Sequence, residues 1–473
     1  IFFFFFDDNQ IKIERKLNSM AAAGIEVNLD DYDLIFKDGF FIDEEDKINV
    51  AYADLRWSVF STWGDNGKKF DNLKNNVFPF IKTLHGDKVT SFAKYMEKAE
   101  FAISNPYILN KMIEALSDPD LGFNKTDMMG DCYEYLLSKM ATSGDNGQFR
   151  TPRHIIDMMV ELAKPTLQDT IIDPAMGTAG FLSESAKYIQ EHYKAELAKK
   201  ENNKHFHNEM FTGFDTDTDM LRIGCMNMTL HGVDNPKIDY NNSLGEDYED
   251  KEKYSLILAN PPFSGSLDPS TVAKSLNQIS GGTKKTELLF LSLFLRLLKI
   301  GGRCVSIIPV GVLNNTNDKA YIRLRKALVE EQKLEGIIFM PSGVFYPYSG
   351  VQTGILIFTK TNAGGTDKVW MYNMENDGYS LDQKRDKIEA DDILDIIARW
   401  NNLADEVNRT KFDKSFLVDK QEIVDNDYDL SINKYKEIVV EKKEYEKPEV
   451  ILKRVIDMEY EIQQKLKELE GLI

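Results

Sequence analysis

The sequence predicts an α/β protein with a doubly wound, mainly parallel sheet of seven strands. Short apolar runs typical of buried strands alternate with stretches of helical spacing, which is the order expected for such a sheet. Several of these runs end in a carboxylate or a carboxamide, and ligands of open α/β sheets bind beyond the carboxyl ends of the strands. The expected strands are residues 170–173, 210–214, 237–240, 255–259, 303–308, 334–339 and 354–358.

Length and charge limit the function. A chain of 473 residues is expected to form two or three domains. Its 77 acidic and 58 basic residues give a net charge of −19, so bulk charge does not favour binding to phosphate backbones. A nucleic-acid substrate would need local basic patches or a partner protein.

Cysteine usage and hydropathy indicate a cytoplasmic protein. Cys132, Cys225 and Cys304 are odd in number and far apart, which fits a reducing compartment and offers no zinc-binding spacing and no disulfide framework. We therefore expect no metal site. No apolar run is long enough to span a membrane, and we expect no membrane partner.

Residues 1–125 are expected to form an N-terminal helical domain. Apolar residues recur at helical spacing in 71–84, 88–102 and 107–116. The opening residues 1–6 are apolar but lack a basic leader and a cleavage site, so they are not a signal peptide and suggest a truncated terminus. The domain carries no visible chemistry; it stabilises the fold or clamps a substrate or partner.

The segment before the first strand is a candidate ligand loop. Gln148-Phe149-Arg150-Thr151-Pro152-Arg153 leads into a helix that continues through Lys164. Thr151 fits the N-cap position and Pro152 the first helical position. A helix N-terminus can hold a small ligand, although the local sequence alone favours an ordinary capped helix.

The first strand ends at Asp173 and runs into Pro174-Ala175-Met176-Gly177-Thr178-Ala179-Gly180. Glycines let the backbone approach a ligand closely. The spacing differs from the dinucleotide fingerprint and from the phosphate loop. A carboxylate at this position would repel phosphates and suits a cationic ligand, such as the amino group and sulfonium of S-adenosylmethionine.

The next two strands also end in polar residues. Asp215 follows the strand at 210–214, and in nucleoside-binding α/β folds an acid there bonds the ribose hydroxyls. Its distance from the first loop exceeds the usual spacing of about 20 residues, which an insertion in the connection explains; Asp217 is the alternative. Asn242 follows the third strand.

Asn260-Pro261-Pro262-Phe263 follows the fourth strand. Two prolines cannot donate to a sheet, so the strand ends there with carbonyls held in rigid positions. The tetrad combines an amide, rigid acceptors and an aromatic face, which suits a flat molecule with an amino group, such as an exposed adenine. A plain strand end followed by a turn explains the same residues. The polar stretch 264–285 is expected to be a mobile loop that closes on the substrate.

From residue 378 the sequence becomes helical and charged, and we assign 378–473 to a C-terminal helical region. Its last helix carries one apolar stripe that docks either on this chain or on another protein. The stripe consists of Ile451, Val455, Met458, Ile462, Leu466 and Leu469.

The order of these motifs resembles that of amino-group DNA methyltransferases. Gln-Phe-x-Thr-Pro at 148–152, Asp-Pro-x-x-Gly-Thr-x-Gly-Phe-Leu at 173–182 and Asn-Pro-Pro-Phe at 260–263 are similar, more narrowly, to modification subunits of type I restriction–modification systems. The resemblance covers roughly residues 50–400; Arg150 stands where relatives often carry an aromatic residue, and Asn242 where an acid is common. Further matching stretches are residues 55–57, 299–303, 341–345 and 377–381.

The resemblance implies a Rossmann-like methyltransferase domain over residues 126–377 that methylates N6 of adenine in DNA from S-adenosylmethionine. Asn260 and the Pro261 carbonyl would accept the amino hydrogens, and Phe263 would stack on an adenine flipped out of the duplex. Pro262 completes the catalytic tetrad. The implied cofactor-binding residues are Gln148, Phe149, Arg150, Thr151, Pro152, Arg153, Asp173, Gly177, Thr178, Ala179, Gly180, Asp215 and Asn242.

The same resemblance implies partners. Two modification subunits would assemble on one specificity subunit, which supplies DNA affinity, and the terminal helix is the candidate docking element. A restriction subunit with nuclease and translocase activity could accompany them. Two alternatives stay open: a protein glutamine or RNA methyltransferase using the same tetrad, and a catalytically silent scaffold.

Overall fold

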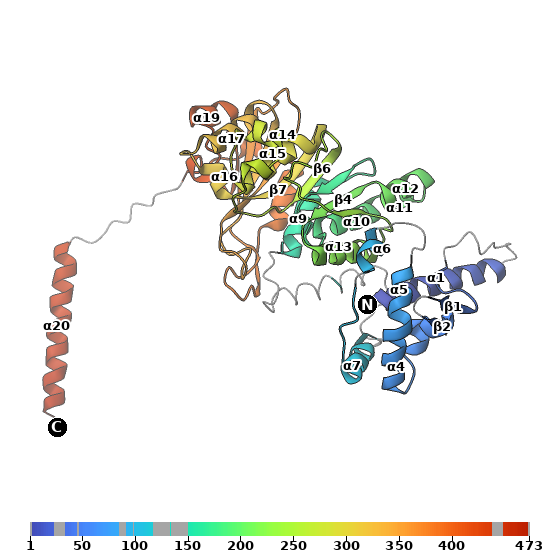
Figure 1. Ribbon diagram of the computed structural model, residues 1–473. Helices are drawn as coiled ribbons and strands as arrows, with labels where there is room; N and C mark the ends of the chain where they lie inside the picture. The colour runs from blue at the N-terminus through green and yellow to red at the C-terminus, as the bar shows by residue number, and fades with distance from the viewer. Residues whose placement is uncertain are drawn as a thin grey trace. The chain divides into compact units, whose positions relative to one another are not determined.

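A mixed sheet of nine strands is the central element of the computed structural model (Figure 1). The structure describes residues 2–22, 34–44, 47–84, 91–97, 99–116, 133, 150–437 and 448–471. The strands are β3 (Ile171–Asp173), β4 (Phe211–Asp215), β5 (Lys237–Tyr240), β6 (Tyr254–Ala259), β7 (Leu298–Pro309), β8 (Lys333–Phe339), β9 (Thr353–Thr359), β10 (Lys368–Asn373) and β13 (Ser415–Asp419). Their order is β13-β10-β8-β9-β7-β6-β3-β4-β5.

The sheet is mainly parallel and doubly wound, which confirms the predicted fold class. β9 runs antiparallel to β7 and β8, and β13 runs antiparallel to β10. Chain order reverses between β3 and β6, where Ile172 is level with Ile257 on one side and with Thr212 on the other. A crevice forms beyond the strand ends at such a reversal.

The sheet has nine strands rather than the seven expected. All seven predicted strands are present, and β10 and β13 extend the sheet beyond β8. β13 is a five-residue edge strand in a charged segment, and its apolar side chains form a strand only because β10 lies beside it. The apolar pattern of β13 is too short to predict this strand from the local sequence.

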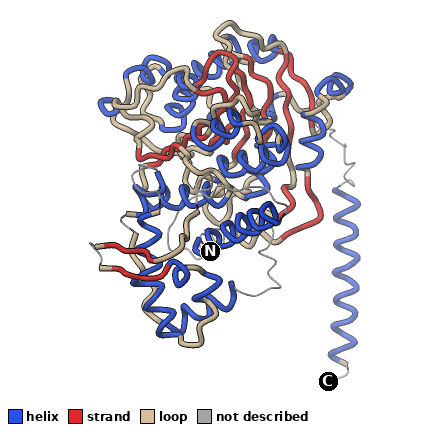
Figure 2. The backbone as a smooth tube through the Cα atoms, turned by 90° about the vertical axis from the view of Figure 1, so that its right-hand side faces the viewer, coloured by secondary structure: helices blue, strands red, loops and turns tan. Residues whose placement is uncertain are grey.

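Strand residues alternate between two hydrophobic cores, and helices cover both faces (Figure 2). Leu256 and Leu258 pack in one core, and Ile257 packs in the other. The first core contains residues of α9 (Arg153–Ala163), α10 (Gly180–His192), α12 (Lys200–Asn208), α13 (Thr218–Leu230) and α18 (Ile393–Trp400). The second contains residues of α14 (Lys274–Ser280), α15 (Thr286–Leu297), α16 (Val310–Asn314), α17 (Lys319–Glu330) and α19 (Lys420–Asp425).

The N-terminal part is built around a third hydrophobic core, to which Leu230 of α13 also contributes. The elements are α1 (Phe2–Ala22), β1 (Phe40–Asp43), β2 (Ile48–Ala51), α2 (Tyr52–Leu55), α3 (Trp57–Phe60), α4 (Asn66–Asn72), η2 (Leu73–Val77), α5 (Phe78–Thr83), α6 (Ser91–Met96) and α7 (Pro106–Leu116). Arg56 links the segment between α2 and α3 to α1, because its guanidinium donates to Asp7 at 2.7 Å and to Glu14 at 2.9 Å. Ser91 Oγ donates to the Pro236 carbonyl at 3.0 Å and so joins this part to the sheet domain.

Two local expectations differ from the structure. Of the helix expected over 88–102, residues 88–90 and 98 lie outside the described residues, and the described part is helical only over the six residues of α6. The expected mobile loop at 264–285 contains η4 (Pro269–Thr271) and α14, whose Leu276 is fully buried. That burial anchors the segment on α15, because the apolar side chain is removed from water.

The C-terminal part divides at Tyr435. One compact unit comprises residues 1–435 and a second comprises 436–473. Residues 378–435, assigned from the sequence to a helical region, therefore belong to the sheet unit. They contribute β12 (Lys387–Asp391), which pairs with β11 (Asp377–Tyr379), and also α18, η5 (Leu403–Asn408), β13, α19 and η6 (Ile432–Lys434).

The second unit contains α20 (Pro448–Glu470). Every residue of this helix is exposed, including its apolar stripe. Across the described parts of the chain, no helix has both the length and the apolar character needed to cross a membrane.

Candidate functional site

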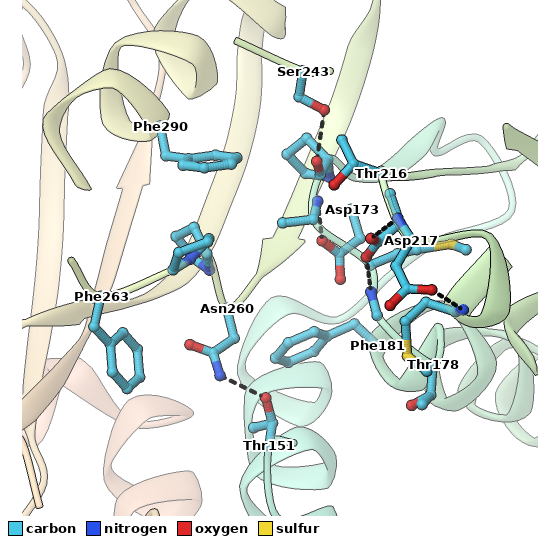
Figure 3. A pocket seen from close by; sticks show the side chains of 18 of the residues that line it. Thr151, Asp173, Thr178, Phe181, Thr216, Asp217, Ser243, Asn260, Phe263 and Phe290 are labelled. Atoms are coloured by element: carbon cyan, nitrogen blue, oxygen red, sulfur yellow. Dashed lines mark hydrogen bonds between the residues drawn. The ribbon is translucent and has the colours of Figure 1, made fainter. Parts of the chain in front are cut away.

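A pocket of about 600 Å³ lies at the carboxyl ends of β6, β3, β4 and β5 (Figure 3). Asp173, Asp215, Asn242 and Asn260, each predicted at a strand end, all line it. These strands are neighbours in the sheet, so their polar ends meet at one edge. The structure thus brings the residues together as the sequence predicted.

Asp173 is the most deeply buried carboxyl group of the pocket, with 1% of its surface exposed. Its Oδ1 accepts a hydrogen bond from the Ala175 amide at 3.0 Å. The pKa of Asp173 is raised to about 8, mainly by burial and also by the charge of Asp215, while the hydrogen bond from Ala175 lowers it. A cation in the pocket would lower the pKa of Asp173 again, because it favours the ionised carboxylate.

The turn from β3 to α10 uses two residues with left-handed backbone. Gly177 has φ +52°, and Ala179, which lines no pocket wall, has φ +60° as the N-cap of α10. The Gly177 amide donates to Asp215 Oδ2 at 2.9 Å. Gly180 serves helix packing: a Cβ there would lie 2.8 Å from Ile156 Cδ1 on α9. Thr178 lines the pocket beside this turn.

Both acids after β4 are held by backbone amides. Asp215 Oδ1 accepts from the Asp217 amide at 2.9 Å, in addition to the bond from Gly177. Asp217 caps α13, since its Oδ1 accepts from the Asp219 amide at 2.8 Å. Each carboxylate oxygen has two lone pairs, so both acids can still accept hydrogen bonds from a ligand.

Asn242 follows β5 in a turn that closes on itself. Its Oδ1 lies 3.3 Å from the Leu244 amide, and its carbonyl accepts from the Gly245 amide at 2.8 Å. The next residue, Ser243, donates to the Pro174 carbonyl at 2.6 Å. This bond links the loops after β5 and β3, which form two walls of the pocket.

Asn260 presents one polar end to the pocket and the other to the protein. Its Nδ2 donates to Thr151 Oγ1 at 2.9 Å. Its Oδ1 is buried and has no hydrogen-bond partner among the residues that the structure describes. A buried acceptor without a partner costs free energy, so this oxygen is suited to a ligand that donates. Pro261 and Pro262 line the pocket next to it.

Phe263 forms an aromatic wall on the same side. Its ring packs edge-to-face on Phe345, with centroids 5.3 Å apart and planes at 80°. Phe345 is buried and holds the ring at a defined angle. Ser349 and Val351, from the same 341–352 segment as Phe345, also line the pocket.

The segment before α9 is only partly placed. Gln148 and Phe149 lie outside the described residues, and Arg150 and Thr151 line the pocket. Burial lowers the pKa of Arg150 to about 10, with the charge of Arg153 as the second cause. The predicted cap differs from the structure: Pro152 is the N-cap and α9 begins at Arg153. Thr151 instead lies one residue earlier, where its hydroxyl meets Asn260.

Arg153 and Pro152 do not line the pocket. The Arg153 guanidinium bonds Glu184 at 2.6 Å and Asp157 at 3.1 Å, so it joins α10 to α9. Sequence reasoning placed both residues with the cofactor because they adjoin a ligand loop. Position along the chain does not show which way a side chain points.

Several lining residues carried no signal in the sequence. They are apolar or small side chains that a fold buries for packing as often as for binding. The nearest signal in the sequence was the resemblance stretch 341–345, which ends before the lining residues Ser349 and Val351. Lining residues of this kind include Thr216, Met220, Ile223, Leu267, Thr286, Phe290, Ser349 and Val351.

The arrangement separates the pocket into two chemically distinct walls (Figure 3). Asp173, Asp215 and Asp217 make one wall acidic, and Asn260, Pro261 and Phe263 offer acceptors and a ring on the other. Among the described residues, no group of three or more His, Cys, Asp or Glu side chains is arranged to hold a metal ion. The site can bind a cation beside a flat amine.

Comparison with known proteins agrees with this geometry. The profile of a family described as N-6 DNA methylase matches residues 124–444. The type I restriction enzyme EcoEI methylase subunit of Escherichia coli is 28% identical over 413 residues, which cover 83% of this chain and 82% of that protein. The EcoKI methylase subunit of Escherichia coli K12 is 32% identical over 264 residues, 52% of this chain and 48% of that protein.

Solved structures show the same fold. A chain from a structure of a type I restriction–modification system has a TM-score of 0.64 at 23% identity and covers all of this chain, with 92% of that chain matched. A type I methyltransferase subunit from Streptococcus thermophilus has a TM-score of 0.63 at 23% identity, over 81% of this chain and 80% of that one. The resemblance stated from the motifs is confirmed.

Proposed function

Because the chain belongs to the N-6 DNA methylase family, we propose that it transfers a methyl group from S-adenosylmethionine to N6 of adenine in duplex DNA. The observation that carries the proposal is the buried Asn260 Oδ1, an acceptor without a partner in the described part of the chain, in the same pocket as the buried Asp173. Asn260 Oδ1 is suited to a ligand that donates a hydrogen bond, and the Asp173 carboxyl is suited to a cation.

The residues present fit the cofactor. S-adenosylmethionine supplies a methyl group on a positively charged sulfur. The carboxyl of Asp173 balances a positive charge, and Asp215 or Asp217 can accept from ribose hydroxyls. Arg150 is a cation on the pocket wall that suits a carboxylate. Gly177, Thr178 and Asn242 complete the proposed cofactor wall, and Gly180 sets the approach of α10 to it.

The target amine would be held by the tetrad. Asn260 Oδ1 and the Pro261 carbonyl would each accept one hydrogen of N6, which turns the nitrogen lone pair toward the methyl group. This is positioning and electrostatic preorganisation. Phe263 would stack on the adenine, which must leave the duplex to reach the pocket. Stacking of this kind is worth about 1–3 kcal/mol per base.

We further propose that DNA recognition depends on partners. The EcoEI and EcoKI relatives are methylase subunits of type I restriction enzymes. By analogy, two copies of this chain would assemble on one specificity subunit, with or without a restriction subunit. The exposed apolar stripe of α20 is the proposed docking element. The net charge of −19 explains why DNA affinity would come from the partner.

Methyl transfer from radiolabelled S-adenosylmethionine tests the activity. The assembled complex should label duplex DNA containing its site, at adenine, and should not label protein or RNA. Label in protein glutamine would instead support the alternative enzyme. Sequencing for N6-methyladenine in hosts with and without the gene and its neighbours would identify the site.

An electrophoretic shift assay tests the dependence on partners. The isolated chain should bind duplex DNA weakly and without sequence preference, and the complex should bind tightly. Removal of residues 436–473 should abolish assembly while the remaining unit still binds the cofactor. Tight, sequence-specific binding by the isolated chain would refute the proposal that DNA affinity comes from the partner subunit.

A further inference from the structure

The carboxamide of Asn260 has two ends of nearly equal shape and opposite hydrogen-bonding character. In the structure the donor end faces Thr151 Oγ1 at 2.9 Å, and the acceptor end faces the pocket (Figure 3). A half-turn of the side chain would exchange them. The Thr151 hydroxyl can accept or donate, so it can hold the carboxamide in either orientation, and a ligand that donates a hydrogen bond favours the one with Oδ1 toward the pocket.

The surroundings of Thr151 restrict the position of the hydroxyl that bonds Asn260. It is buried, with 7% of its surface exposed, and it directly precedes the N-cap of α9. The first amides of this helix are held by the Pro152 carbonyl, which accepts from Ile155 at 3.0 Å and from Ile156 at 3.1 Å. Thr151 is β-branched, so its side chain has few accessible rotamers. The position of its hydroxyl is set by the helix and not by the pocket.

The contact connects two distant parts of the chain. Thr151 and Asn260 are 109 positions apart, and the hydroxyl is the protein partner of the carboxamide in the structure. Without it, Nδ2 would lose this partner, and the carboxamide would be held less firmly. The turned orientation would set Nδ2 against the amino group of the substrate, which places two donors face to face.

We propose that Thr151 is a positioning residue for methyl transfer: its hydroxyl accepts from Asn260 Nδ2 and so holds the carboxamide in place while Oδ1 accepts from the amino group to be methylated. The inference rests on the proposed function. It assigns Thr151 a role toward the catalytic carboxamide that its place in a cofactor loop does not imply.

Thr151→Val tests the proposal, because valine keeps the branched shape and removes the hydroxyl. In the full-chain complex we expect the single-turnover rate of methyl transfer to fall about 3- to 10-fold, as loss of one neutral hydrogen bond implies. The Kd of S-adenosylmethionine, the KM for DNA and the Tm should change little. Thr151→Ser, which restores a hydroxyl, should recover most of the rate.

Thr229→Val is the matched control. Thr229 is also a buried threonine, and its hydroxyl bonds the Cys225 carbonyl at 3.0 Å within α13, away from the pocket lining. This variant should transfer methyl groups at the wild-type rate. It shows that loss of a buried threonine hydroxyl does not by itself slow the reaction.

Three outcomes would overturn the inference. A wild-type rate in Thr151→Val would show that the carboxamide needs no such partner. A rate loss matched by an equal loss of cofactor affinity would make Thr151 a cofactor contact, and a rate loss that Thr151→Ser does not recover would exclude the hydroxyl. If the wild-type complex methylates no DNA, the proposed function itself fails, and this inference fails with it.

Discussion

Asp173→Asn should remove the contribution of residue 173 to the pH dependence of S-adenosylmethionine affinity. In the free protein, burial raises the pKa of Asp173 to about 8, from an ordinary value of 3.8. The folded chain therefore keeps a proton at this site between about pH 4 and pH 8 that the unfolded chain releases. The sulfonium of S-adenosylmethionine favours the ionised carboxylate, so binding must expel that proton.

The magnitude follows from the pKa. Between pH 6 and pH 8.5 the ionised fraction of a group with a pKa of about 8 rises from about 1% to about 75%. Cofactor affinity should rise by as much as about 75-fold over this interval and level off above it. Stability of the free chain changes in the opposite sense: the folded state binds more protons, so it should lose about 2.5 kcal/mol as pH rises through the same interval.

Asn at position 173 keeps an oxygen for the bond from the Ala175 amide and carries no proton to lose. In Asp173→Asn the part of both pH dependences that comes from residue 173 should therefore disappear. The cofactor should also bind more weakly than to the wild type at pH 8.5, because the neutral side chain cannot balance a positive charge.

Titration calorimetry with S-adenosylmethionine at several pH values, on wild type and variant, measures the binding. The amino group of the cofactor titrates too, but it affects both proteins equally, so the ratio of their Kd values isolates Asp173. Thermal unfolding of the free proteins over the same range measures the stability. If the Kd values of the two proteins change with pH in the same way, cofactor binding does not displace a proton from Asp173.

Three further predictions concern the two walls of the pocket. Asn260→Ala should abolish methyl transfer and leave the cofactor Kd largely unchanged in calorimetry; unchanged activity would remove this residue from the mechanism. Phe263→Ala should raise the KM for DNA about 5- to 150-fold through lost stacking, and 2-aminopurine fluorescence at the target position should drop. Gly180→Ala should lower the Tm, because its Cβ would meet Ile156 Cδ1 at 2.8 Å, and adding Ile156→Val, which removes that atom, should restore most of it.

The sequence by itself determined the fold class, seven of the nine strands and the set of strand-end residues. Short apolar runs bounded by proline, glycine or acids showed the seven strands correctly, because this pattern is local. Parallel strands connected by helices end at one edge of a sheet. For that reason Asp173, Asp215 and Asn260 could be placed in one crevice before any coordinates were known.

Tertiary structure alone decided the contacts between segments distant in sequence. β13 becomes a strand because β10 supplies its hydrogen-bond partners, and Gly180 is needed for the approach of two helices. Arg153 points to Glu184 and not to the pocket, and Thr151 meets Asn260 instead of capping α9. These outcomes depend on distances through space and side-chain directions, which a local pattern of residues does not contain.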